Sequence, residues 1–242
     1  MCNDNRLINA SQLKPGDVLL CVVEGDLAQR VERATESNYS HAAICYSSTE
    51  IVHVELRGIK KIPIELLVRG TKHIAVFRNP YLWRHPLYVE ALKGFLDKAI
   101  QNNVRYDRGS AEELMERRAD HHLTLLAKLH AHFLDGLEPQ SHEKLKYICS
   151  EFIVACFTGV GFIKPNARIL YQCDTYTPAD LGRDPTFGFL VGYIKHGNDY
   201  EIPTNDEFAK NVTLHETQLA ELGDSGGIEA ASENHAVGTG IG

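Results

Sequence analysis

The chain has 242 residues, of which 43% are hydrophobic and 24% charged, and this composition is enough for one sizeable globular domain. The formal net charge of −7 argues against nucleic acid as a partner, because binding phosphates requires a basic face. No apolar run approaches the roughly 18 residues that cross a bilayer, so we expect no transmembrane segment. The first residues, MCNDNRLINA, lack the pattern of a secretory signal. We therefore expect a cytoplasmic protein, or one exported by a signal-independent route.

The sequence pattern of the first hundred residues is typical of a region rich in β-strands. Alternation along residues 51–56 places His53 and Glu55 on one face of a strand. The four-residue spacing of Leu87, Ala91, Phe95 and Ala99 indicates a helix. In chain order, we predict a strand at 18–23, a helix at 26–34, strands at 41–46 and 51–56, a helical turn at 63–68, a strand at 73–78 and a helix at 86–101.

The second half contains a helical insertion and a second group of elements. The insertion, at about 108–142, is charged in its first part and amphipathic in its second, and Gly136 and Pro139 end its helix. A proline at the first helical position after Thr177 indicates another helix start. In chain order, we predict helices at 110–135 and 147–160, a short helix at 177–181 and a strand at 187–195.

The last 39 residues differ in composition from the rest. Residues 204–242 carry seven acidic residues and one lysine, a charge of −6 out of the total −7, and they end in a stretch rich in Gly, Ser and Ala. Such a segment buries too little apolar surface to fold by itself. We therefore predict one domain over residues 1–203 and a disordered acidic tail over 204–242.

Cys149 is the candidate nucleophile. The six cysteines lie far apart and form no C-x-x-C pair, so we expect reduced thiols. Cys149 stands where an apolar helix begins, and the unpaired N–H groups and positive dipole end of that helix would favour a thiolate and hold an oxyanion. A buried structural cysteine is the alternative interpretation of the same position.

Two histidines are candidates for the base and its partner. His41 opens an apolar strand, and His53 follows twelve residues later in the next one. Neighbouring antiparallel strands could bring the two imidazoles together, so that one takes the proton and the other orients it. Glu55, on the same face as His53, could orient the base instead.

The order of these segments resembles a known family. Residues 15–20 (PGDVLL), 40–44 (SHAAI) and 51–53 (IVH) look like the strand core of NlpC-type cell-wall peptidases. The cysteine segment 149–152 (CSEF) comes after these strands instead of before them. That order, together with TPADL at 177–181, resembles the permuted papain-like amidases typified by YaeF and YiiX. The match touches most of residues 12–195.

The resemblance implies a fold and a reaction. The fold is α+β, a circularly permuted papain-like (NlpC-like) fold in which an antiparallel sheet packs on a central helix bearing the cysteine. The roles implied are Cys149 as nucleophile, His41 as base and His53 as third member. A histidine at the third position is more like the lecithin:retinol acyltransferase group. The expected function is a cysteine hydrolase (amidase or peptidase) that forms an acyl-cysteine. The alternatives are a lipid acyltransferase or phospholipase, and a catalytically silent binding module.

Substrate and cofactor follow from the same interpretation. Peptide, peptidoglycan-like and acyl-lipid substrates all remain open. Tyr147 and Tyr106 are candidates for an oxyanion contact. Five histidines between 121 and 142 suggest a metal, but no carboxylate or cysteine completes a ligand set, so we expect neither a metal nor another cofactor.

Overall fold

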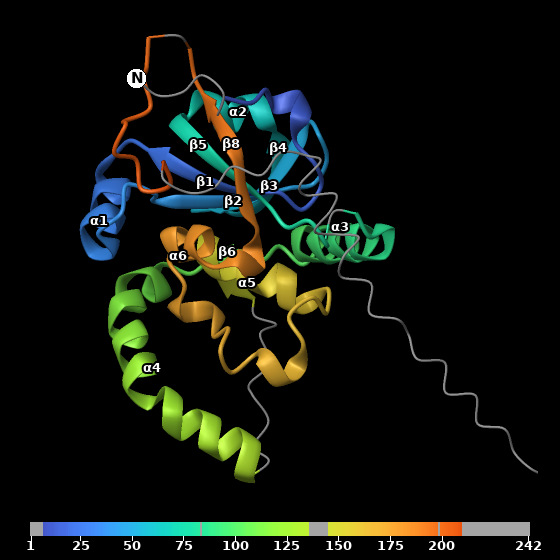
Figure 1. Cartoon of the computed structure of the whole chain (residues 1–242), viewed down its shortest axis with the longest axis vertical. Helices are drawn as coiled ribbons and strands as arrows, with labels where there is room; N and C mark the ends of the chain where they lie inside the picture. Colours follow the sequence, from blue (N-terminus) through green and yellow to red (C-terminus); the bar gives the residue numbers. More distant parts are fainter. Residues whose placement is uncertain (1–6, 83, 136–144, 198, 210–242) are drawn as a thin grey trace, which may run out of the picture.

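The fold is mixed α+β and is built on one antiparallel sheet. The computed structural model describes residues 7–82, 84–135, 145–197 and 199–209 (Figure 1). Six strands pair in the order β4-β3-β2-β1-β5-β8, and each neighbouring pair is antiparallel. The strands are β1 (Val18–Val23), β2 (His41–Cys45), β3 (Glu50–Glu55), β4 (Gly58–Pro63), β5 (Thr71–Arg78) and β8 (Phe189–Lys195).

Helices cover both faces of this sheet (Figure 1). Helix α2 packs on one face, and α5 packs on the other with α3 and α6 beside it. Two further short strands, β6 and β7, form a separate parallel pair. The helices are α1 (Asp26–Thr35), α2 (Ile64–Arg69), α3 (Pro86–Gln101), α4 (Arg108–Asp135), α5 (Cys149–Gly159) and α6 (Pro178–Arg183), and the short strands are β6 (Arg105–Tyr106) and β7 (Lys146–Tyr147).

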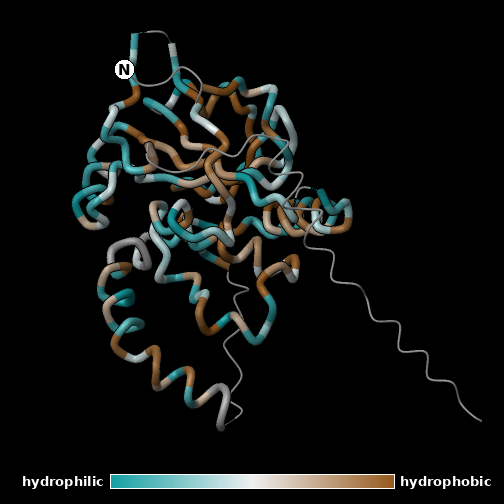
Figure 2. The backbone as a smooth tube through the Cα atoms, viewed as in Figure 1, coloured by the Kyte–Doolittle hydropathy of each residue, from teal (hydrophilic) through white to brown (hydrophobic). Residues whose placement is uncertain are grey.

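The central strand β1 is apolar along its length because both its faces are covered. Val18 and Leu20 point into the core under α5, whereas Leu19 and Cys21 belong to the core under α2. Successive side chains of a strand point to opposite faces, so a strand buried on both sides requires a continuous apolar run. The hydrophobic colour along the strands and α5 in Figure 2 follows these two cores.

A buried ion pair fixes the turn that precedes β1. Arg78 donates hydrogen bonds of 2.8 Å from Nε and from Nη2 to the two oxygens of Asp17, and both side chains are buried. Gly16 adopts φ +87°, and a Cβ at this position would lie 2.3 Å from Leu82. Gly16 therefore allows a backbone geometry and a close approach that other residues would not.

The packed domain extends beyond the boundary expected at residue 203. Asp206 and Phe208 are 5% and 1% exposed, and Phe208 packs on Tyr39 and Phe77 at ring-centroid distances of 4.9 and 5.0 Å. Residues 204–209 thus belong to the fold, because one aromatic side chain and one hydrogen-bonded carboxylate attach them to it. The remainder of the predicted tail, 210–242, and residues 136–144 of the predicted insertion lie outside the described residues.

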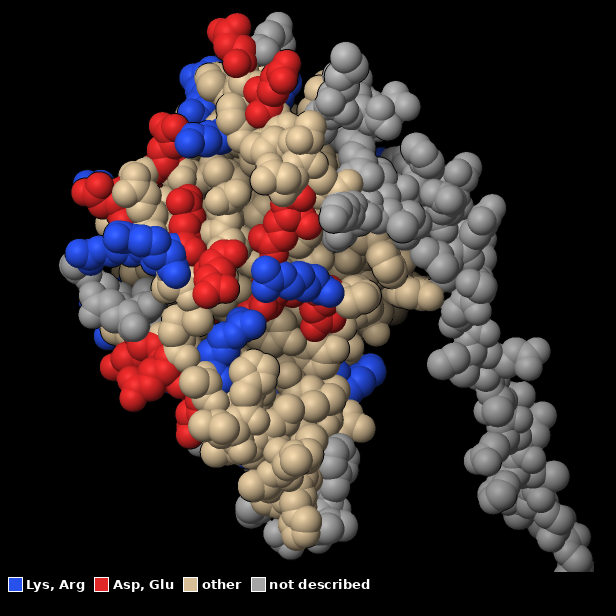
Figure 3. All heavy atoms as spheres, turned by 60° about the vertical axis from the view of Figure 1, so that its left-hand side comes forward, with Lys and Arg blue, Asp and Glu red and all other residues tan. Residues whose placement is uncertain are grey.

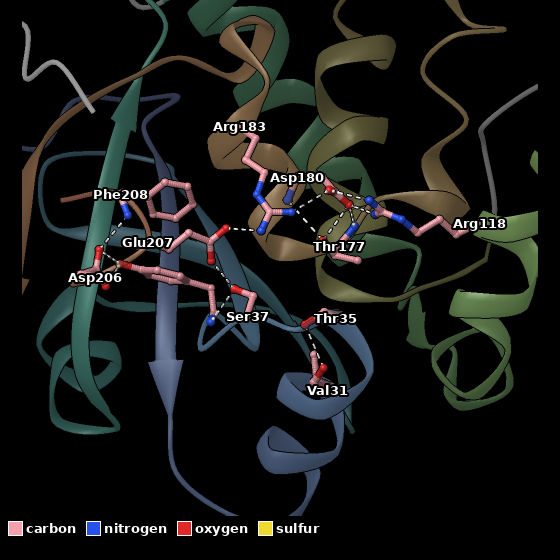
Figure 4. Close-up of polar contacts among 11 residues, drawn as sticks. Val31, Thr35, Ser37, Arg118, Thr177, Asp180, Arg183, Asp206, Glu207 and Phe208 are labelled. Atoms are coloured by element: carbon pink, nitrogen blue, oxygen red, sulfur yellow. Dashed lines mark hydrogen bonds and ion pairs between the residues drawn. The ribbon is translucent and has the colours of Figure 1, made fainter. Parts of the chain in front are cut away.

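A chain of polar contacts links the C-terminal segment to α6 and α4 (Figure 4). Ser37 donates a hydrogen bond of 2.6 Å to Glu207, which is also paired with Arg183. Arg183 lies 3.6 Å from Asp180, and Asp180 forms a two-point ion pair with Arg118 of α4. These contacts connect the loop before β2 with two helices from distant parts of the sequence.

The surface carries both signs of charge. On the face shown in Figure 3, Lys and Arg side chains lie among Asp and Glu side chains and form no continuous basic surface. That face therefore lacks the positive field that phosphate backbones require.

Candidate functional site

The two predicted histidines are in contact. The register of β2 and β3 pairs Ala43 with His53, so His53 is the diagonal neighbour of His41 on the same face. His41 Nε2 and His53 Nδ1 lie 3.1 Å apart, and the two ring planes meet at 79°. Because its Nε2 is engaged by His53, His41 has Nδ1 left for a second partner.

Cys149 is the first residue of α5 and is partly buried. Glu151, which is fully buried, accepts a hydrogen bond of 3.1 Å from the backbone N–H of Ile148 and so closes the first turn of the helix. This contact fixes the backbone on either side of the cysteine.

Two opposing effects act on the pKa of the Cys149 thiol. Burial raises its pKa, and the backbone N–H groups of Ala42, Ser150 and Cys149 itself lower it by a smaller amount. The sequence argument from the helix N-terminus predicts a stabilised thiolate. In the folded protein burial outweighs the N–H groups, so the resting cysteine is a neutral thiol.

Both histidines are neutral as well. Burial, followed by the neighbouring His53 ring, lowers the pKa of His41 to about 3. Burial is also the main cause of the lowered pKa of His53. At rest the cavity wall therefore carries an uncharged thiol and two uncharged imidazoles.

Cys149, His41 and His53 line one cavity of about 560 Å³. This volume is within the range of small-molecule sites. Aliphatic side chains from both helices and strands form much of its wall, and two of them, Leu56 and Leu66, are 71% and 51% exposed. The aliphatic lining residues are Val23, Ala28, Val31, Val54, Leu56, Ile62, Leu66, Leu67, Leu114 and Ile148.

The other candidates occupy different positions. Glu55 lines the cavity, but its carboxylate is paired with Lys60. Tyr106 also lines the cavity. Tyr147 is not among the described lining residues, since its ring is buried against Phe152 at a centroid distance of 5.7 Å. The structure therefore keeps Tyr106 as an oxyanion candidate and places Tyr147 in the core.

In the described part of the chain, no three or more His, Cys, Asp or Glu side chains lie close enough together to bind a metal ion. His121 and His122 are adjacent on α4, and their ring centroids lie 6.2 Å apart.

Sequence reasoning missed three parts of the site. Ser40 lines the cavity directly before His41, and the N–H of Ala42 reaches the cysteine sulfur. The aliphatic wall was also missed. A serine before a histidine is too common to be a signal, and the wall is assembled from segments as distant as Val31 and Leu114, which no local pattern connects.

Comparisons with known proteins leave the site to be interpreted from its geometry. No protein-family model matches the chain, and no curated protein matches it either. Within the described residues, no helix combines the length and the apolar character that crossing a membrane requires. The site thus consists of a thiol at a helix start and a pair of neutral histidines, all lining one cavity with a largely aliphatic wall.

Proposed function

We propose that this protein is a cysteine hydrolase that cleaves amide or ester bonds through an acyl-cysteine intermediate. The observation that carries the proposal is the 3.1 Å contact between His41 and His53 on the wall of the cavity that Cys149 also lines. A nucleophile, a base and a group that orients the base are the components that this chemistry needs. The permuted papain-like architecture, with the cysteine helix packed on an antiparallel sheet, is part of the same proposal.

In the proposed reaction, Nδ1 of His41 takes the proton of the Cys149 thiol as the sulfur attacks the substrate carbonyl. The backbone N–H groups of Ser150 and Ala42, which lower the pKa of the Cys149 thiol, are the proposed donors to the oxyanion. His41 then gives its proton to the leaving amine or alcohol. Water, activated by the same ring, releases the acyl group as a carboxylic acid and restores the thiol.

His53 has a positioning role in this reaction. His41 can accept a proton on Nδ1 only if its other proton stays on Nε2, and His53 Nδ1 is the acceptor that holds it there. His53 thus selects the tautomer of His41 that is competent as a base.

The direct test is trapping of the acyl-enzyme. The protein is mixed with an activated ester such as p-nitrophenyl acetate, quenched in acid and weighed intact, and the modified peptide is then located by fragmentation. We expect one acetyl group on Cys149 in the wild type, none in Cys149→Ala, and the wild-type result in Cys45→Ala. Acetyl groups spread over several cysteines, or absent altogether, would contradict the proposal and favour a silent binding module.

The aliphatic wall of the cavity favours the second candidate function, chemistry on an acyl lipid with the same residues. A hydrolase and an acyltransferase share the first half-reaction and differ in the acceptor. The ratio of free acid to transferred product, measured in the presence of an alcohol or amine acceptor, separates the two.

A further inference from the structure

Helix α1 contributes three residues to the wall of the cavity of about 560 Å³, namely Asp26, Ala28 and Val31. Helices α4 and α6 contribute Leu114 and Pro178 to the same wall. These residues come from separate helices, so no single element determines how far apart they lie. The space available to a ligand therefore depends on where α1 lies relative to α4 and α6.

Helix α1 has little packing of its own. Among its described side chains only Ala28 is buried, and the others are half-buried or exposed. The side chains of Arg33 and Thr35 donate to carbonyl groups of the same helix. Its caps, Gly25 and Glu36, have φ values of +120° and +52°, so the helical conformation ends on both sides. Because most of the stability of a helix in a protein comes from packing, α1 depends on a further contact to hold it in place.

Ser37 connects the end of α1 to the C-terminal segment. Its backbone N–H donates to the carbonyl of Glu32 in α1 at 3.3 Å, and its hydroxyl donates to the carboxylate of Glu207 at 2.6 Å. The hydroxyl oxygen also accepts from the N–H of Tyr39 at 3.1 Å. Ser37 is 7% exposed, so water does not easily replace its partner. The contact with Glu207 therefore fixes where α1 ends.

Glu207 is held in turn by the residues on both sides of it. Asp206 is hydrogen-bonded in the core, and the ring of Phe208 lies against α6, where a Cβ on Gly182 would come within 2.5 Å of it. Glu207 also pairs with Arg183 of α6 (Figure 4). Since the side chain of Arg183 is 51% exposed, this ion pair contributes little by itself. Glu207 thus presents its carboxylate to α1 from a backbone that is anchored in the core and on α6.

We propose that Glu207 is a positioning residue, which holds Ser37 and so fixes α1 relative to α6 and sets the width of the cavity. Glu207 is not among the described lining residues of the cavity, so it acts only through α1. Resting on the proposed function, it affects binding of the part of the substrate that lies beside Val31. The attack of Cys149 on the carbonyl does not involve it. Loss of the contact should therefore raise KM and leave kcat close to that of the wild type.

Hydrogen exchange of the full chain tests the position of α1 without any assumption about catalysis. In Glu207→Ala and in Ser37→Ala, the amides of residues 29–36 should exchange about three- to tenfold faster than in the wild type. Glu207→Gln keeps an oxygen acceptor for Ser37, so its exchange should stay within about twofold of the wild type. Glu201→Ala removes an exposed carboxylate of the same segment and is the matched control. Unchanged exchange in both Glu207→Ala and Ser37→Ala would overturn the inference.

Two esters test the effect on the cavity. For p-nitrophenyl hexanoate, Glu207→Ala should raise KM by about three- to tenfold and change kcat by less than about twofold. For the smaller p-nitrophenyl acetate, both constants should stay within about twofold. The double variant Ser37→Ala/Glu207→Ala should be no worse than either single variant, because both remove one contact. A fall in kcat for both esters with KM unchanged would show that Glu207 does not act through the cavity.

The two experiments separate this inference from the proposed function. Acylation of Cys149 with α1 exchange that does not respond to Glu207→Ala or Ser37→Ala would leave the function standing and overturn the inference. Faster exchange in those two variants without acylation of Cys149 in the wild type would contradict the function and support the position assigned to Glu207. Thermal unfolding curves check that each variant is folded. If Glu207→Ala does not fold, Ser37→Ala removes the same contact and leaves the C-terminal segment intact.

Discussion

The hydroxyl of Tyr193 donates a hydrogen bond of 2.8 Å to the carboxylate of Asp206, and this contact attaches the C-terminal segment to the last strand of the sheet. Tyr39 also donates to Asp206, at 3.1 Å, and His73 lies 3.3 Å from it. Removing some of the hydrogen-bond partners of a buried carboxylate lowers the stability of the fold. The segment is therefore part of the folded core.

The first prediction concerns truncation of this segment. A chain ending at Pro203 loses Asp206 and the buried ring of Phe208. Loss of one such ring costs about 3–5 kcal/mol, so its melting temperature should fall by about 10 °C. A chain ending at Ala209 retains these contacts and is the matched control. Equal melting temperatures for the two truncations in differential scanning calorimetry would show that Asp206 and Phe208 contribute nothing to stability.

The second prediction concerns the nucleophile. Cys149→Ala should lower kcat/KM by about 10³-fold or more, because the Cys149 thiol is the nucleophile of the proposed mechanism. Its melting temperature should stay close to that of the wild type, since alanine is compatible with a helix start. Cys156→Ala, which removes a fully buried thiol in the same helix, should be less stable but active. Full turnover by Cys149→Ala would end the proposed mechanism.

The third prediction orders the losses around the base. His41→Ala should lower kcat by about 10²- to 10⁴-fold. His53→Ala should cost less, because it removes only the group that holds the His41 tautomer. Glu55→Ala should stay within about threefold, since Glu55 pairs with Lys60 at the surface. If Glu55→Gln proves as damaging as His41→Ala and His53→Ala is silent, Glu55 is the orienting group and the amidase interpretation gains.

The fourth prediction concerns pH. The base form of His41 is the neutral ring, and its pKa is lowered to about 3 from an ordinary 6.5. As pH falls, His41 should therefore stay competent well below 6.5. The acid limb of kcat/KM should lie below pH 5 for substrates without ionisable groups. An acid limb near pH 6.5 would contradict this prediction, because it would show a histidine of the site titrating as an exposed ring does. Loss of that limb in His53→Asn would identify the titrating ring as that of His53.

The fifth prediction follows from the neutral thiol. Since burial raises the pKa of Cys149, its alkylation by iodoacetamide should have an inflection above that of a free cysteine. The measurement is the rate of carbamidomethylation of the Cys149 peptide as a function of pH, with free N-acetylcysteine as reference. An inflection below neutral pH would reveal a thiolate–imidazolium pair in the resting protein.

Local patterns were sufficient to predict much of the fold. The helix at 86–101 has the predicted bounds, and the strand at 18–23 does too. Strand β4 was missed because its sequence, GIKKIP, carries two lysines and no clear alternation. Those lysines suit an edge strand, which is where the sheet places β4. Recognising an edge strand requires knowledge of its neighbour, and a single segment does not contain it.

The site was predictable only where its parts are close in sequence. The twelve-residue spacing on adjacent strands indicated that His41 and His53 could meet, and they do. The ionisation state of Cys149 was not predictable, because it depends on how deeply the helix start is covered. That cover comes from segments distributed over the chain. The catalytic roles of all three residues stay predictions.

The position of the cysteine helix in the sequence has a consequence for synthesis on the ribosome. Strands β2 to β4 are joined by short connections, so the two strands that carry the histidine pair are complete once about sixty residues have emerged. Cys149, the proposed nucleophile, is made nearly a hundred residues later, and Asp206 and Phe208 later still. In the proposed mechanism, a nascent chain of that length thus has the base and its partner but no thiol, and the reactive set is complete only when almost the whole domain has been made.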